Sequence, residues 1–178
     1  GRTNAFADNW MPILEWGSEF SAKWASLSDS QVNEGIRDPI KVYEYMNKFY
    51  VLEGNKRVSV LKYFKAVTVN AQVIRKIPKK SDDPDVKIYY EFMDFYKATK
   101  LNDIYFSKEG SFTTLMDLVG IELGKVMDED AKKDLVSSYL NFRTAYESRG
   151  GDRFDFPVGD AYLRFIHIHG YDNVKHMT

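Results

Sequence analysis

The 178-residue chain has no cysteine, which excludes disulfide bonds, thiolate metal ligands and cysteine nucleophiles. The lack of cysteine also fits a reducing compartment, so we expect a cytoplasmic protein. Histidine is scarce, and His167 and His169 stand two positions apart, which would point them to different sides of a helix. We therefore expect no metal site. No apolar run reaches the roughly 18 residues that a membrane span needs, so we expect no membrane partner.

Apolar residues are plentiful, whereas the charge is unevenly distributed. The chain is 44% hydrophobic and 15% aromatic, which is enough for a buried core. Its net charge is only −1, but residues 36–80 hold 11 Lys and Arg against 3 Asp and Glu, a surplus of eight positive charges. Residues 81–178 hold 12 basic against 18 acidic residues. The basic segment favours phosphate-bearing partners, and the alternative is an ordinary solvated surface.

The sequence Glu53-Gly54-Asn55-Lys56-Arg57 is the most informative motif. It lies between an apolar stretch at residues 49–52 and a helical pattern at residues 58–64. A glycine at such a junction lets the backbone approach a ligand closely, and the free amides of the new helix face that ligand. Lys56 and Arg57 add two cationic donors. We therefore predict that Gly54, Asn55, Lys56 and Arg57 bind a phosphate group.

The flanking patterns predict a small mixed sheet. Residues 36–42 are extended, because Pro39 forces Asp38 out of a helix. Residues 43–45 and 49–52 form a hairpin, and the alternation over residues 68–74 predicts a half-buried strand that buries Val69, Ala71 and Val73. Before the sheet, residues 28–34 are expected to form a short helix, with Ser28 and Gln31 in capping-box spacing and Gly35 as its stop.

This order of elements resembles the ParB/sulfiredoxin superfamily. The resemblance covers residues 28–74, about a quarter of the chain, and is strongest at Pro39-Ile40-Lys41-Val42 and at residues 52–57. It implies an α+β domain that binds nucleotide phosphates at its Gly-x-x-Arg helix, here Gly54 and Arg57. Members include DNA-segregation and transcription factors, sulfinic acid reductases and small-molecule kinases. The reductases need a cysteine in this loop, so that activity is excluded.

Other matches to the superfamily are partial. Glu53 matches the acidic residue that often precedes the glycine in the kinase-like relatives. Lys56 stands where many members have histidine, and no clear Glu-Asn-x-x-Arg segment of the segregation proteins follows. The ligand implied by the resemblance is a nucleotide such as CTP or ATP, with or without Mg²⁺.

The remainder of the chain is expected to be mainly helical. Caps are predicted at Asp83, Ser111, Asp128 and Asp160, with the last helix running over residues 161–169. We therefore expect an N-terminal aromatic arm at residues 1–27, a ParB/sulfiredoxin-like core at 28–80 and a helical extension at 81–178, either separate or forming one compact unit with the core. Residues 79–85 are the best candidate boundary. The arm holds Trp10, Trp16 and Trp24, which pack on the domain or form a protein-contact surface.

Three functional classes remain open. The favoured one is a ParB-like nucleotide-binding module of a DNA-associated or transcription-regulatory protein. In it, DNA is bound through Lys76, Lys79 and Lys80 or through a region outside this sequence, and a protein partner or a homodimer is compatible. The second is a Mg²⁺-dependent phosphotransferase or nucleotide hydrolase, with Glu53 as its catalytic residue. The third is a protein-interaction domain that has lost the ligand.

Overall fold

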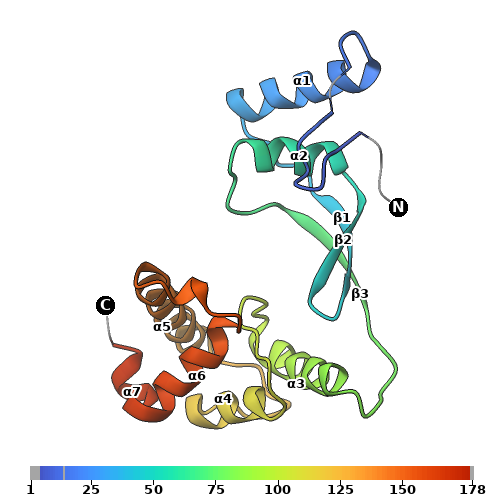
Figure 1. Ribbon diagram of the computed structural model, residues 1–178. Helices are drawn as coiled ribbons and strands as arrows, with labels where there is room; N and C mark the ends of the chain where they lie inside the picture. Colours follow the sequence, from blue (N-terminus) through green and yellow to red (C-terminus); the bar gives the residue numbers. More distant parts are fainter. Residues whose placement is uncertain (1–4, 14, 177–178) are drawn as a thin grey trace. The chain divides into compact units, whose positions relative to one another are not determined.

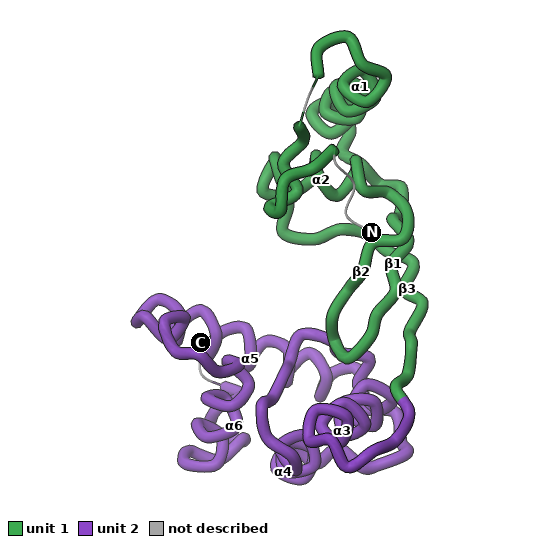
Figure 2. Tube along the Cα trace, turned by 45° about the vertical axis from the view of Figure 1, so that its right-hand side comes forward, with its two compact units in different colours: residues 1–78 green, residues 79–178 purple. Residues whose placement is uncertain are grey.

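The structure is a computed structural model that describes residues 5–13 and 15–176. Contacts along the chain divide it into two compact units, Gly1–Pro78 and Lys79–Thr178 (Figure 2). The described residues form seven α-helices and one three-stranded mixed sheet, which confirms the predicted α+β class. Within these residues, none of the helices has both the length and the apolar character needed to cross a membrane.

The sheet of unit 1 has the strand order β2-β1-β3 (Figure 1). β1 (Ile40–Tyr45) and β2 (Lys48–Glu53) form an antiparallel hairpin. Its two loop residues, Met46 and Asn47, have positive φ angles of 50° and 61°, which match the twist of a tight hairpin. β3 (Ala71–Lys76) pairs with β1 in parallel, so the predicted small mixed sheet is confirmed.

β3 differs from its prediction in position and burial. It begins at Ala71 rather than residue 68, and it is exposed rather than half-buried, with Val73 46% exposed. Val69, which was expected to be buried in this strand, lies before it and is 42% exposed. β3 is exposed because it lies at the edge of the sheet. The core of unit 1 forms over the central strand β1. There Ile40, Val42 and Val58 cluster together.

A buried ion pair joins the edge strand to the central one. Glu44 on β1 is 1% exposed, and the Nε atom of Arg75 on β3 lies 2.6 Å from its Oε2. The other carboxylate oxygen accepts a hydrogen bond of 2.7 Å from the Asn47 amide in the hairpin loop. Because a buried carboxylate is costly without partners, these two contacts fix the β1–β3 register and the loop.

The first helix is longer than predicted. α1 spans Glu19–Asn33, and its N-cap is Ser18, whose side chain accepts from the Ser21 amide. The cap predicted at Ser28 is therefore wrong, although the chain does leave the helix at Gly35, with φ +75°. α1 packs beside α2 (Asn55–Tyr63) (Figure 1). Between these helices, the indole nitrogen of the buried Trp24 donates to the Ser59 hydroxyl at 3.0 Å.

The other two tryptophans have different environments. Trp10 packs against the core of unit 1, whereas Trp16 is fully exposed. The N-terminal aromatic arm therefore packs on unit 1 through Trp10 and Trp24.

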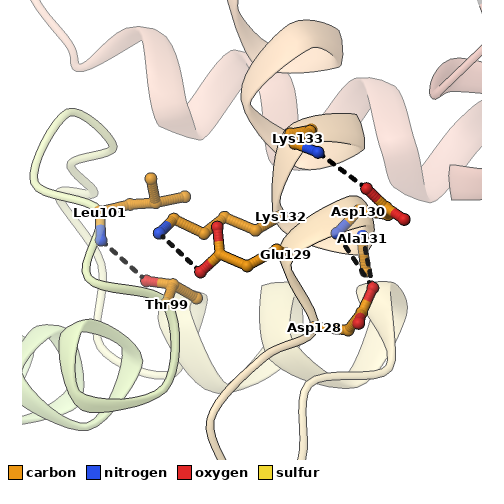
Figure 3. Close-up of polar contacts among 8 residues, drawn as sticks. All are labelled: Thr99, Leu101, Asp128, Glu129, Asp130, Ala131, Lys132 and Lys133. Atoms are coloured by element: carbon orange, nitrogen blue, oxygen red, sulfur yellow. Dashed lines mark hydrogen bonds and ion pairs between the residues drawn. The ribbon is translucent and has the colours of Figure 1, made fainter.

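Unit 2 is helical, as expected. Asp83 and Asp128 are confirmed as N-caps of α3 (Pro84–Thr99) and α5 (Glu129–Ser148), and the Asp128 carboxylate accepts from the Asp130 and Ala131 amides (Figure 3). Two predicted caps are wrong, because Ser111 is the first residue of its helix and Asp160 lies inside α6 (Val158–His169). Asp160 instead accepts from the Ser107 amide at 3.1 Å. The helices of unit 2 are α3 (Pro84–Thr99), α4 (Ser111–Val119), α5 (Glu129–Ser148), α6 (Val158–His169) and α7 (Tyr171–Val174), with a 3₁₀ turn at Gly151–Arg153.

Candidate phosphate-binding site

The backbone at Gly54 requires glycine. β2 ends at Glu53, and Gly54 follows as the N-cap of α2 with φ 99° and ψ 23°. A Cβ atom at this position would lie 2.7 Å from the Cγ2 atom of Ile40 on β1. The strand-to-helix loop therefore packs directly on the central strand, and it has a backbone conformation that other residues adopt only with strain.

The first turn of α2 has the charge pattern of an anion site. Gly54 offers no side chain to the first-turn amides, and that turn has no acidic residue. It carries Lys56 and Arg57 instead, at the end of the helix where the dipole is already positive. α3 and α5 begin in the opposite way, each with an aspartate cap and acidic residues in the first turn. An anion bound to the α2 amides would relieve this accumulation of positive charge.

Arg57 connects the motif to the proline segment. Its Nη1 atom donates to the Pro39 carbonyl oxygen at 2.6 Å. This contact joins the segment at Pro39-Ile40 to the segment at Gly54–Arg57. These two segments are the ones that resemble the ParB/sulfiredoxin superfamily. A guanidinium has five N–H donors in a fixed plane, so a single bond to Pro39 orients the group and leaves other donors for a ligand.

A pocket of about 450 Å³ opens at this helix terminus. One side is formed by Gly54, Asn55, Lys56 and Arg57, which are all half-buried. The other side is apolar and comes from the N-terminal segment and α1. The ammonium group of Lys56 lies 5.2 Å from the ring centroid of Phe20, a distance typical of a cation–π contact. The remaining lining residues are Ala5, Phe6 and Leu27.

Sequence reasoning missed this apolar wall. Phe6 and Phe20 pack edge to face with ring centroids 5.3 Å apart. They lie more than thirty positions before the motif, and no local pattern links them to it. The concentration of aromatic residues in the first 24 positions is the available signal, but by itself it predicts only an arm that packs on the domain or contacts another protein.

Glu53 is engaged by a cation. Its Oε2 atom lies 2.7 Å from the Lys41 ammonium, and both side chains are about half exposed. The hydrogen bond from Lys41 lowers the pKa of Glu53, and the charges of Lys41 and Arg57 act in the same direction. A carboxyl with a lowered pKa stays ionised at neutral pH and is a weaker base, which counts against proton abstraction by Glu53.

The predicted nucleic-acid lysines belong to both units. Lys76 ends β3 in unit 1, whereas Lys79 and Lys80 begin unit 2. Their ammonium groups have different neighbours, because Lys76 lies 4.8 Å from the Tyr43 ring centroid and Lys80 lies 5.2 Å from that of Tyr90. Lys76 and Lys80 therefore each contact an aromatic ring of their own unit.

A metal site is not evident in the part of the chain that the structure describes. No group of three or more His, Cys, Asp or Glu side chains is placed there to hold an ion. His167 and His169 lie on α6, where the His169 ring packs on Phe165 with centroids 4.5 Å apart.

The chain matches no protein-family model, curated protein or solved structure.

Proposed function

We propose that unit 1 is a ParB-like nucleotide-binding module of a DNA-associated or transcription-regulatory protein. The observation that supports this most is the start of α2, which has no side-chain cap, carries two cations and borders a pocket with an aromatic wall. Backbone amides and cations suit the phosphates of a nucleotide. Phe6 and Phe20 offer apolar rings to its base or sugar.

The pocket fits a ligand of this class in size and chemistry. Its volume of about 450 Å³ is within the range of small-molecule sites, roughly 300–1,000 Å³. In the proposal, the amides of Asn55, Lys56 and Arg57 hold the phosphates, and Arg57 adds a charged hydrogen bond from the position that Pro39 fixes. CTP and ATP are the nucleotides to test, each with and without Mg²⁺.

Isothermal titration calorimetry across the four ribonucleoside triphosphates tests this proposal. Arg57→Ala should weaken nucleotide binding by about 1.5–3 kcal/mol, the value of a hydrogen bond to a charged group. Lys62→Ala is the matched control, because Lys62 is an exposed cation in the last turn of the same helix. It should leave the affinity unchanged. An absence of binding by every nucleotide at millimolar concentration would favour the interaction-domain alternative.

Replacing Glu53 distinguishes a regulatory function from an enzymatic one. In a regulator, Glu53→Gln removes a negative charge beside the phosphates and frees Lys41, so nucleotide binding should be equal or slightly tighter. In a phosphotransferase or hydrolase, the same variant should bind nucleotide but lose turnover. We favour the regulator because Lys41 already engages this carboxylate. Phosphate release or transfer by the purified protein that is lost in Glu53→Gln would reverse that choice.

A further inference from the structure

The sheet of unit 1 has one face directed away from its core. Alternate residues of a strand point to opposite faces, and Ile40 and Val42 point towards Val58 of α2. The opposite face, here called the outer sheet face, carries Tyr43, Tyr45, Lys48, Tyr50, Ile74 and Lys76. Tyr45, Tyr50 and Ile74 on this face are 43%, 52% and 43% exposed.

The strand register arranges these residues in two rows. In the first row, Tyr43 of β1 is paired with Tyr50 of β2 on one side and with Ile74 of β3 on the other. In the next row, Tyr45 is flanked by Lys48 and Lys76. The outer sheet face therefore presents aromatic rings on neighbouring strands, with a lysine at each side.

The charge of this face is positive. Lys48 and Lys76 have no carboxylate partner in the described part of the chain, and Lys76 instead lies over the Tyr43 ring at 4.8 Å. The acidic residue near the opposite end of the face, Glu53, is paired with Lys41. Among the described residues, these two lysines therefore lie beside exposed aromatic rings without an ion-pair partner.

We propose that the outer sheet face binds single-stranded nucleic acid. Bases stack on the Tyr50 and Tyr45 rings, and Lys48 and Lys76 contact the phosphates of the same strand. A single strand fits better than a duplex, because the bases of a duplex are already stacked on one another. A protein partner fits less well, because unpaired lysines are depleted in protein interface cores. This site uses none of Gly54–Arg57, so it does not depend on the proposed nucleotide site.

Fluorescence anisotropy with the full chain tests the proposal. The probes are labelled single-stranded DNA and RNA of about ten nucleotides, within the range that one small domain contacts, and a duplex of the same sequence. We expect both single strands to bind more tightly than the duplex at low salt. Tyr50→Ala should weaken single-strand binding about tenfold, the effect of removing one stacking platform.

Phe49→Ala is the matched control. Phe49 precedes Tyr50 on β2 and is equally exposed, at 50%, but it pairs with Glu44 and so lies on the opposite face. Its removal should leave nucleic-acid binding unchanged. Lys48→Gln and Lys76→Gln should each reduce the slope of log affinity against log salt by about 0.7, the value for one phosphate contact to a single strand. Lys62→Ala, which removes an exposed cation in the last turn of α2, should leave oligonucleotide binding unchanged.

Three results would overturn the proposal. One is the absence of binding to either single strand at low salt, and another is an equal loss of affinity in Phe49→Ala and Tyr50→Ala. The third is a dimer, seen in sedimentation velocity, that is disrupted by Tyr50→Ala but not by added oligonucleotide. That result would assign the outer sheet face to a second copy of the chain. Urea unfolding of each variant separates a lost contact from a lost fold.

Discussion

Replacing Gly54 with alanine measures how closely the motif packs on the sheet. Two costs arise in the folded state. A left-handed conformation costs an L-residue about 1–2 kcal/mol. The new Cβ atom would also lie 2.7 Å from Ile40 Cγ2 and 3.4 Å from Ile40 Cα, and relieving such overpacking costs about 1–3 kcal/mol. We therefore expect Gly54→Ala to destabilise unit 1 by about 2–5 kcal/mol.

Gly35→Ala isolates the first of these costs. Gly35 also has a positive φ angle, +75°, but a Cβ atom there would meet nothing within 4 Å. We expect it to destabilise unit 1 by only about 1–2 kcal/mol. Urea unfolding followed by tryptophan fluorescence is the assay, because Trp10, Trp16 and Trp24 all lie in unit 1 and report its unfolding within the intact chain. Equal destabilisation by the two variants would refute the argument from the Ile40 contact.

Two further predictions concern unit 2, where far-UV circular dichroism reports helix unfolding. Burial raises the pKa of Tyr162 from 10.0 to about 12. The neutral phenol therefore contributes to the stability of the fold below pH 10, and this contribution is lost as the pH rises towards 12. The loss of stability between pH 10 and pH 12 should be smaller in Tyr162→Phe. Asp128→Ala removes both hydrogen bonds that cap α5 (Figure 3) and should lower the free energy of unfolding by about 1 kcal/mol. Lys133→Ala breaks an exposed ion pair on the same helix and should lower it by less than about 0.5 kcal/mol. Equal effects of these last two variants would contradict the capping argument.

Features set by neighbouring residues could be predicted from the sequence. The hairpin follows from two short apolar runs around Met46 and Asn47, and the caps at Asp83 and Asp128 follow from an aspartate directly before a helical pattern. Gly54 was also identified correctly as the junction between strand and helix. In each of these cases, the residues that decide the structure lie within a few positions of one another.

Features that depend on distant contacts could not be predicted in the same way. The start of α1 was misplaced because Ser18 and Ser28 both have the chemistry of a cap, and the packing of Trp24 on Ser59 favours the longer helix. The alternation over residues 68–74 indicated a strand but not its place at the sheet edge, where Val73 stays exposed. The Phe6 and Phe20 wall likewise depends on how the N-terminal segment packs.

The strand order β2-β1-β3 also affects how the protein behaves at high concentration. Both outer strands of the described sheet are edges, and exposed edges can pair with strands of other molecules. Lys48 and Lys76 lie on these edges, so edge-to-edge pairing of two copies brings like charges together. Salt weakens that repulsion, because it is screened over about 10 Å at 0.1 M. Concentrated salt should therefore promote aggregation through β2 and β3, and dilute buffer should keep the chains apart.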